Sequence, residues 1–392
     1  MNKFDISRRR SLEALAGFLA GSPLLKGQID PIRDHARVPG IKELLTSFEF
    51  EAVMYSKQTR AVYDYRAYGE ESEFTLRRNR LAFDWVQLVK NQTTASAAQT
   101  ATELFGTKMA FPLMVSPTAL HGDLDKDGEQ ATHKGAAAAS GTPMILSNNS
   151  TLSFDKVMPA APSPMWIQLY PKQAMDANKT YLEPAIAQGA KAVVVTIDQQ
   201  SSTYERSLHD RNLNALGGGR GRFGGGGPAP AANPYRMSTG RLWYEWKFFD
   251  ELRDFVKVPI LAKGILTAED AKLALEHGVD GIYVSNHGGR SLDYGPSTLE
   301  VLPEIVDAVA GKVPVVFDSG LRRGSDVLKA LALGANAVCL GRVPLWGLGA
   351  YGATGVTRVL EIIQAELVQA MLQSGCTSLD SINRKIVLPN FP

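Results

Sequence analysis

Short apolar runs alternate with longer segments of helical periodicity from residue 111 onward. Eight of the runs have the length and the apolar, β-favouring composition that is typical of strands buried on both faces of a parallel sheet. We expect strands at residues 111–116, 143–147, 165–170, 191–198, 258–264, 281–286, 313–320 and 336–342. Helical patterns lie between them, for example at 128–140, 268–278 and 324–334, and the last two end in Gly, a common helix stop.

Eight strands that alternate with helices predict an α/β fold in which a parallel sheet closes into a (β/α)8 barrel, the TIM barrel. An open, doubly wound sheet is the alternative. Polar residues cluster at the C-terminal end of nearly every expected strand. This favours the barrel, because barrel enzymes build their active sites at that end.

Three regions need a separate description from the eight expected strands and the helical segments between them. Residues 41–105 show helical patterns, so we expect an N-terminal helical cap within a barrel domain spanning 41–380. Residues 199–240 follow the fourth strand and are rich in Gly and Pro, which predicts a mobile insertion loop over the barrel mouth. A functional lid and an inert insertion are both open readings. Residues 355–372 have the pattern of the last barrel helix.

The first 30 residues have the composition of an export signal. Lys3 and Arg8 to Arg10 precede a mildly apolar stretch at residues 12–25, which is shorter than the ~20 residues of a spanning helix. Ser7-Arg8-Arg9 resembles the opening of a twin-arginine signal. We therefore expect a periplasmic or exported protein. If the segment is instead a basic tail or a short amphipathic helix, the protein is cytoplasmic.

Composition narrows the function classes. The 42 basic and 40 acidic residues leave a net charge of +2, and no basic run is present, so we expect no nucleic-acid partner. The two cysteines, Cys339 and Cys376, form no CxxC pattern, and we expect no metal site. Cys339 lies in an apolar run, where a buried thiol is expected.

The polar residues at the eight strand ends would converge on one cavity of a closed barrel. They are Ser116-Pro117-Thr118-Ala119, Ser147-Asn148-Asn149, Gln168-Leu169-Tyr170, Thr196-Ile197-Asp198, Lys263-Gly264, Ser285-Asn286-His287, Asp318-Ser319-Gly320 and Gly341-Arg342. Core packing alone would favour apolar residues at these positions.

The last two strand ends indicate a phosphorylated ligand. Many barrels bind phosphate after strands seven and eight, through backbone N–H groups and a helix N-terminus. Gly320 and Gly341 allow close backbone approach there, and Arg322 and Arg342 supply positive charge.

His287 is the best candidate for a catalytic base. Two glycines and Arg290 follow it, which indicates a tight turn that presents the imidazole to the cavity. Asp198 could orient the ring and stabilise its cation, and Arg290 could bind a substrate carboxylate with two hydrogen bonds. His121 follows the first strand end and is a further candidate to line the site.

These motifs together resemble the FMN-dependent 2-hydroxy-acid oxidase and dehydrogenase family, which includes glycolate oxidase, lactate oxidase and mandelate dehydrogenase. The similarity covers about residues 41–380, and its most specific motifs are AKG, SNHGGRSLD and DSGLRRG with a later GR. Residues 63–80 resemble the family's N-terminal signature, which places Tyr65 at its active-site tyrosine.

The resemblance implies an FMN cofactor, a small L-2-hydroxy acid substrate that becomes a 2-oxo acid, and a homotetramer. His287, paired with Asp198, would be the base, and Tyr65, Tyr170 and Arg290 would bind the substrate. Lys263 would stabilise the anionic reduced flavin. The remaining cofactor-binding residues would be Pro117, Thr118, Ala119, Ser147, Gln168, Thr196, Ser285, Asp318, Gly320, Arg322, Gly341 and Arg342. Oxygen or a respiratory acceptor would reoxidise the flavin.

Two positions depart from the family pattern. Relatives usually carry a second substrate-binding arginine where this chain has Glu205, although Arg206 is its neighbour. Asn148 and Asn149 stand where relatives commonly have a small and then an aromatic residue, which indicates a more polar substrate or altered oxygen reactivity. An exported flavin-binding protein without turnover and an FMN-barrel isomerase are the alternative functions.

Overall fold

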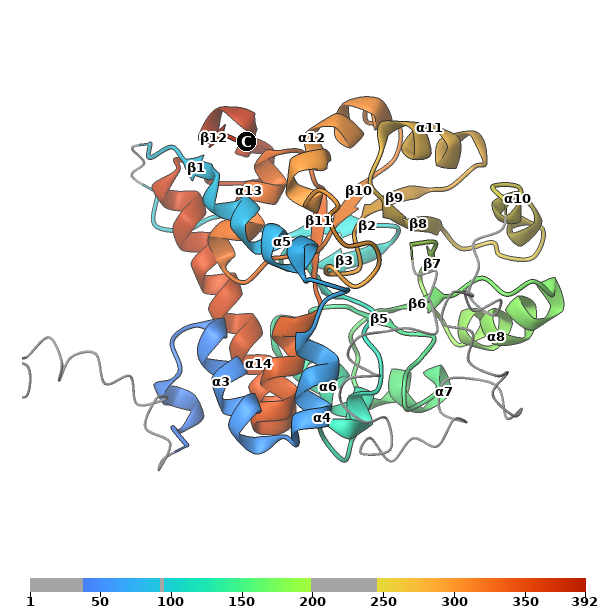
Figure 1. Ribbon diagram of the computed structural model, residues 1–392, viewed down its shortest axis with the longest axis horizontal. Coiled ribbons are helices and arrows are strands. Elements are labelled where there is room, and N and C mark those ends of the chain that lie inside the picture. The colour runs from blue at the N-terminus through green and yellow to red at the C-terminus, as the bar shows by residue number, and fades with distance from the viewer. Residues whose placement is uncertain (1–37, 92–94, 199–244) are drawn as a thin grey trace, which may run out of the picture. The chain divides into compact units, whose positions relative to one another are not determined.

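The computed structural model describes residues 38–91, 95–198 and 245–392, and it contains two units (Figure 1). In the first unit, Met1–Leu45, the described residues form one 3-10 turn, η1 (Ile41–Glu43). The second unit, Thr46–Pro392, contains the barrel. The predicted export signal, most of the 199–240 insertion and the Glu205 departure lie outside the described residues.

A closed barrel of eight parallel strands forms the centre of the second unit, as predicted. Its strands are β4 (Leu113–Val115), β5 (Met144–Leu146), β6 (Met165–Leu169), β7 (Val193–Thr196), β8 (Ile260–Ile265), β9 (Gly281–Val284), β10 (Val315–Phe317) and β11 (Ala337–Leu340). The last strand pairs with the first, with Val338 opposite Leu113. This pairing excludes the open sheet.

Alternation along the strands separates the inside of the barrel from the outside. The inward positions near the strand starts are apolar or aromatic and form one buried cluster, which includes Met114, Trp166, Val194, Leu261, Tyr283, Val316 and Cys339. Two residues further along each strand, the inward position is polar in most cases. The barrel therefore has a packed floor with a polar layer above it.

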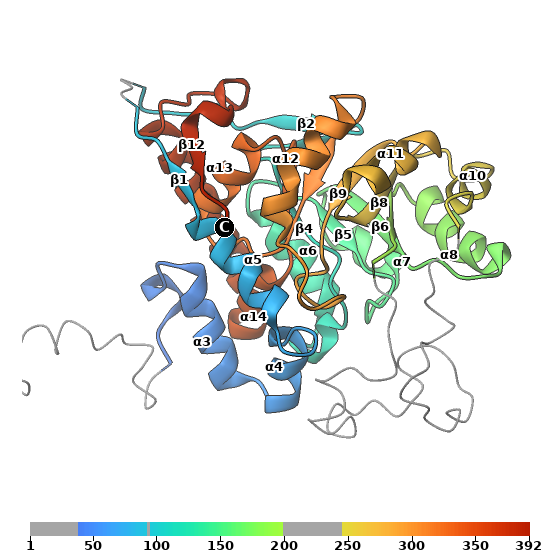
Figure 2. The ribbon, with the colours of Figure 1, turned by 45° about the horizontal axis from the view of Figure 1, so that its top comes forward.

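Helices surround the barrel (Figures 1 and 2). They are α6 (Gly128–Ala138), α7 (Phe154–Val157), α8 (Met175–Ala187), α10 (Phe248–Arg253), α11 (Ala268–Glu276), α12 (Thr298–Val309), α13 (Gly324–Ala332) and α14 (Arg342–Gln373). The helices predicted at 128–140, 268–278 and 324–334 are confirmed as α6, α11 and α13. The α12 N-terminus is stabilised by Ser297 and Glu300, whose side chains bind each other's backbone N–H groups.

The last helical segment begins earlier than the sequence pattern indicated. Helical structure runs from Arg342, and its non-helical residues Tyr351 and Gly352 mark a kink. A Cβ on Gly355 would lie 2.0 Å from the carbonyl oxygen of Gly347, so only glycine permits the close approach on either side of this kink. The predicted helix at 355–372 is the part after the kink.

The N-terminal segment of the second unit is helical only in part. The predicted helices are present as α3 (Ser47–Lys57), α4 (Arg60–Ala67) and α5 (Phe74–Asp84). Three short strands that we did not expect follow, β1 (Val86–Leu88), β2 (Thr102–Leu104) and β3 (Thr107–Met109); β1 pairs with the C-terminal β12 (Val387–Pro389). The strands were missed because three-residue runs carry almost no periodicity.

The β2–β3 hairpin covers the N-terminal end of the barrel. Its Leu104 and Met109 belong to the buried interior cluster, and Phe105 lies against Trp166 with ring centroids 5.8 Å apart. Thr107 accepts a 2.8 Å hydrogen bond from the Trp166 indole N–H. The floor of the barrel is thereby sealed, which leaves the C-terminal end for chemistry.

Cys339 and Cys376 are both free and buried. Across the described ranges, no helix has the length and apolar character needed to cross a membrane.

Candidate active site

The predicted strand-end residues meet in one polar layer above the barrel floor. The buried members of this layer are Ser116, Ser147, Gln168, Thr196, Lys263, Ser285 and Asp318. Each lies near the C-terminal end of its strand or just past it. Closure of the barrel therefore brings together residues that are up to 202 positions apart in the sequence, as in the Ser116–Asp318 contact.

His287 lies on a left-handed turn after β9. Its φ is 57°, and Gly288 and Gly289 follow with φ of 68° and 75°. A non-glycine residue in this region is uncommon and is found mainly where the surrounding structure holds it. The His287 N–H donates to Ser285 Oγ at 3.1 Å, and the Gly289 N–H donates to Asn286 Oδ1 at 3.2 Å.

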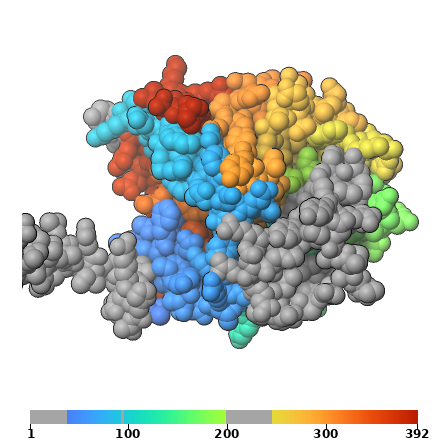
Figure 3. Space-filling view, viewed as in Figure 1, coloured from blue at the N-terminus to red at the C-terminus, as the bar shows by residue number. Residues whose placement is uncertain are grey.

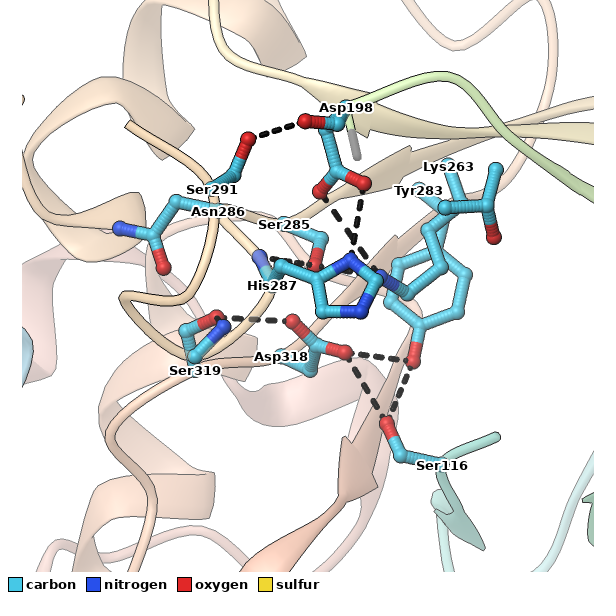
Figure 4. Close-up of polar contacts among 12 residues, drawn as sticks. Ser116, Asp198, Lys263, Tyr283, Ser285, Asn286, His287, Ser291, Asp318 and Ser319 are labelled. Atoms are coloured by element: carbon cyan, nitrogen blue, oxygen red, sulfur yellow. Dashed lines mark hydrogen bonds and ion pairs between the residues drawn. The ribbon is translucent and has the colours of Figure 1, made fainter. Parts of the chain in front are cut away.

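The imidazole pairs with Asp198, as predicted (Figure 4). Nδ1 and Asp198 Oδ1 are 2.9 Å apart. Burial would raise the pKa of Asp198, but the neighbouring Lys263 and His287 outweigh burial and lower it. The carboxylate is therefore ionised and can only accept, which places the His287 proton on Nδ1 and leaves Nε2 as the acceptor. Burial lowers the pKa of His287, against the opposing charge of Asp198.

Lys263 extends along the inside of the barrel from β8. Its Nζ donates to Ser285 Oγ at 2.9 Å and lies 3.9 Å from Asp198 Oδ2. Gly264 makes this arrangement possible, because a Cβ at its position would lie 2.5 Å from the Asp198 Cβ. The close approach of Asp198 explains why glycine follows the lysine in the AKG motif.

Three of the predicted substrate-binding residues border the imidazole. Tyr170 Oη lies 3.4 Å from His287 Nε2, the nitrogen with the free lone pair. Arg290 donates through Nη1 to the carbonyls of Tyr65 and Tyr68, at 2.8 and 2.9 Å. Its guanidinium carbon lies 5.1 Å from the centre of the Tyr65 ring. The α4 C-terminus thus holds Arg290 beside Tyr65.

A chain of hydrogen bonds links three predicted cofactor-binding residues on neighbouring strands. Ser147 donates to Gln168 Oε1 at 3.4 Å, and Gln168 donates to Thr196 Oγ1 at 3.0 Å. Asn148 accepts the Tyr170 N–H at 3.1 Å. One of the two departures from the family pattern therefore orients the β6 end.

The Pro117-Thr118-Ala119 segment follows β4 and is held in place by a hydrogen bond to a buried histidine. Thr118 Oγ1 bonds to Nε2 of the fully buried His121 at 2.8 Å, and the other ring nitrogen of His121 bonds to Thr132. With both ring nitrogens engaged in this way, His121 supports the loop.

Asp318 is the centre of a second buried network. Its Oδ2 accepts from Tyr283 Oη at 2.9 Å and from Ser116 Oγ at 3.0 Å (Figure 4). Its Oδ1 accepts from Ser319 Oγ at 2.9 Å. Burial raises the pKa of Tyr283 well above its ordinary value, and the charge of Asp318 adds to this effect.

Two predicted phosphate-binding arginines carry partly buried positive charge. Burial lowers the pKa of Arg322 to about 10 and that of Arg342 to about 9. Neither pairs with a carboxylate within 4.0 Å among the described residues; Arg322 lies over the Trp346 ring, and Arg342 donates to the carbonyls of Arg66, Tyr68 and Gly288. Partly buried guanidinium groups of this kind are suited to an anionic group such as a phosphate.

The backbone at the two phosphate candidates differs from the expectation. At the start of α13, the N–H groups of Arg322 and Arg323 donate to Asp326, and that of Gly324 donates to Glu366. These carboxylates occupy the donors that we expected a phosphate to use. α14 begins after Gly341, which has no side chain that could cap the first N–H groups of the helix.

One supporting residue was missed from the sequence. Asn79 of α5 and Asn286 exchange two amide hydrogen bonds, of 2.8 and 2.7 Å. The neighbouring Arg78 pairs with Glu300 of α12, and these two elements adjoin on the face shown in Figure 3. Asn79 lies in the segment similar to the family signature, but a pairing partner 207 residues away leaves no local pattern.

Known proteins are similar to this chain in sequence and in fold. The sequence profile of FMN-dependent dehydrogenases matches residues 55–389. A peroxisomal (S)-2-hydroxyacid oxidase of Arabidopsis thaliana is 37% identical over 350 residues, which make up 86% of this chain and 95% of the relative.

Two solved structures are similar over most of their length. The structure described as a lactate oxidase of Pediococcus acidilactici is 31% identical, with a TM-score of 0.79, over 89% of this chain and 96% of that one. A flavocytochrome b2 variant is 28% identical, with a TM-score of 0.81, over 90% of this chain and 89% of that one.

Proposed function

The chain belongs to the FMN-dependent dehydrogenase family, whose members oxidise 2-hydroxy acids, and on this premise we propose that it converts a small L-2-hydroxy acid to the 2-oxo acid, with His287 as the base. One observation carries this proposal. His287 Nδ1 lies 2.9 Å from an ionised Asp198, and Nε2 faces Tyr170 Oη at 3.4 Å.

His287 accepts the substrate proton at Nε2. The imidazolium that results stays paired with Asp198, so the added positive charge is compensated within the same hydrogen bond. Lys263, at 3.9 Å from Asp198, keeps that carboxylate ionised throughout. General base catalysis of this kind contributes about 10²- to 10⁴-fold to a rate.

Arg290, Tyr65 and Tyr170 bind and orient the substrate. Arg290 uses Nη1 to hold the α4 C-terminus. Its other donors make no hydrogen bond to the part of the chain that the structure describes, and they would bind the substrate carboxylate. Arg290 thus couples substrate binding to the helix that carries Tyr65. The Tyr170 hydroxyl lies beside His287 Nε2, where it can orient the substrate hydroxyl.

FMN fits the residues of the barrel mouth, because the partly buried guanidinium groups of Arg322 and Arg342, which have no ion pair with a described carboxylate, suit its phosphate. When bound, FMN supplies a two-electron acceptor. Lys263 and the Ser147–Gln168–Thr196 chain, with Ser285 and the Pro117-Thr118-Ala119 segment, would hold the ring system, and Asp318, Gly320 and Gly341 would complete the site. The family membership of the chain supports this assignment.

Asn149 supports a substrate that is more polar than lactate or mandelate. It follows Asn148, whose side chain accepts the Tyr170 N–H, and both amides come just after β5, at the end of the barrel where the proposed site lies. The reoxidant, oxygen or a respiratory acceptor, follows from the family as a proposal, as does a homotetramer, which a mass measurement in solution would check.

Anaerobic addition of substrate tests the proposed function. Purified protein with bound FMN is mixed with glycolate, lactate and more polar 2-hydroxy acids, and the flavin absorbance is followed. We expect bleaching, fastest with a polar L-acid, and peroxide formation under air if oxygen is the acceptor. Absence of bleaching with every acid would favour a flavin-binding protein without turnover.

A further inference from the structure

Ser319 adopts a backbone conformation that favours glycine. Its φ is 83°, in the left-handed region, and it is only 8% exposed. A serine there costs backbone energy that a glycine would avoid. Since the residue is buried, the feature that distinguishes it from glycine is its hydroxyl, and the contacts of that hydroxyl identify its role.

The Ser319 hydroxyl bridges two elements. It donates to Asp318 Oδ1 at 2.9 Å (Figure 4), and it accepts the Gly288 N–H at 3.1 Å. A hydroxyl has one donor and two acceptor positions, so it can make both bonds at once. Gly288 directly follows His287, so the bridge ends one peptide away from the imidazole.

Each N–H of the His287 turn is held by a different side chain. Ser285 accepts from His287, and Asn286 accepts from Gly289. Ser319 accepts from Gly288, in the middle of the turn, and is the one of the three that comes from another strand end. Three successive residues with positive φ can hold one conformation only if such contacts fix it.

The other end of the bridge is rigid. Asp318 Oδ2 is engaged by Tyr283 Oη and Ser116 Oγ, at 2.9 and 3.0 Å. Tyr283 is fully buried in the barrel interior. The Ser319 hydroxyl therefore ties the His287 turn to a fixed point in the barrel core.

We propose that Ser319 is a positioning residue for the reaction: its hydroxyl orients the His287 imidazole toward Asp198 and the substrate by holding the Gly288 peptide to Asp318. This role rests on the proposed function, because it acts through the proposed base. Through this bridge, the end of β10, which is proposed to bind FMN, also supports His287.

The test replaces Ser319 with glycine. Ser319→Gly relieves the left-handed backbone, but it also leaves the Gly288 N–H and Asp318 Oδ1 without this partner. The two effects on the melting temperature oppose each other, so its change should be small. Loss of one buried hydrogen bond at the turn should slow anaerobic flavin reduction about three- to tenfold, with the substrate concentration for half-saturation unchanged. The acidic limb of the kcat/KM profile should move to lower pH, because a looser Asp198 contact raises the pKa of His287 less.

Ser140→Gly is the matched control. Ser140 also has a left-handed backbone, with φ of 58°, and its hydroxyl makes one bond, of 3.2 Å, to Gln364. It follows α6, away from the strand ends, so its replacement should leave reduction unchanged. Ser319→Cys keeps the shape of serine with a weaker hydrogen-bonding group, and its rate should fall between those of the parent and the glycine variant.

The outcomes separate this proposal from the function itself. If the parent protein is not reduced by any 2-hydroxy acid, the proposed function fails and the role of Ser319 fails with it. If the parent is reduced, and both Ser319 variants match its rate and pH limb, the positioning role alone is overturned. A change in half-saturation at an unchanged reduction rate also overturns it.

Discussion

The backbone conformation, the hydrogen bonds and the nearby charges at His287 together determine the orientation and the protonation of its imidazole. The left-handed turn presents the imidazole to the barrel mouth, and the Asp198 bond of 2.9 Å fixes its tautomer. Burial lowers its pKa while Asp198 acts in the opposite direction. The imidazole therefore stays neutral, and able to accept a proton, to a lower pH than in water.

Replacement of the base is the first prediction at this scale. His287→Gln keeps a polar side chain of similar length but cannot take the proton, so anaerobic flavin reduction should slow by about 10²- to 10⁴-fold. Stopped-flow absorbance measures the rate. Retention of FMN, checked by the absorbance spectrum, separates loss of the base from loss of the cofactor. A rate within twofold of the parent would exclude His287 as the base.

The pH profile is the second prediction. Neutral His287 is the active form, so kcat/KM should fall as the pH drops through its pKa, which burial places below the ordinary value. In Asp198→Asn the carboxylate that raises this pKa is lost. The acidic limb should then move to still lower pH while the plateau falls. A limb that moves to higher pH would contradict the assignment of the pair.

At the scale of elements, the β2–β3 hairpin contributes to stability at the end of the barrel opposite the reactive residues. It closes the N-terminal end of the barrel through Leu104, Phe105 and Met109. The reactive residues lie at the opposite strand ends, as is general for barrels of this fold. Substitutions in the hairpin should therefore change the free energy of unfolding and leave flavin reduction unchanged.

Thr107→Val tests this separation. Valine has nearly the same shape, but it leaves the buried Trp166 N–H without its 2.8 Å partner. Chemical denaturation should show a loss of about 1–3 kcal/mol in the free energy of unfolding. Thr102→Val in the same hairpin is the control, because no hydrogen bond of its hydroxyl is found among the described residues; it should change stability by less than about 0.5 kcal/mol.

At the scale of the whole molecule, the site depends on segments spread over most of the chain. Tyr65 lies on α4, Asp198 follows β7, and Arg342 begins α14. The family match at 55–389 includes all of them. By contrast, the predicted export signal precedes the matched region, so export and catalysis should be separable by mutation.

Export is the prediction at this scale. Replacing Arg8 and Arg9 together with lysine preserves the charge of the N-terminal segment but removes the pair that a twin-arginine receptor would read. In a host with that pathway, flavin-containing protein should shift from the periplasmic to the cytoplasmic fraction. Arg10→Lys, adjacent to the pair, should not shift it. Equal distribution of parent and double variant would exclude this route.

Local patterns were sufficient to predict the barrel and the strand-end residues that its closure brings together. The apolar runs predicted eight strands. The polar residues at the ends of these strands include Lys263, Asp198 and His287, so these three could be chosen as candidates from the sequence. This works because strand alternation and strand-to-helix order are properties of neighbouring residues. Barrel closure then brings every strand end to the same place.

Other features depend on contacts between distant residues, and only the tertiary structure decided them. The Asn79–Asn286 amide pair and the Ser319 bridge from Asp318 to Gly288 join segments with no common local pattern. The carboxylates of Asp326 and Glu366 occupy the α13 N-terminus that we had assigned to phosphate. Which groups become hydrogen-bond partners here depends on how the elements pack against one another. Such partners, like the pairing of the three-residue strands, can therefore be identified only in the folded chain.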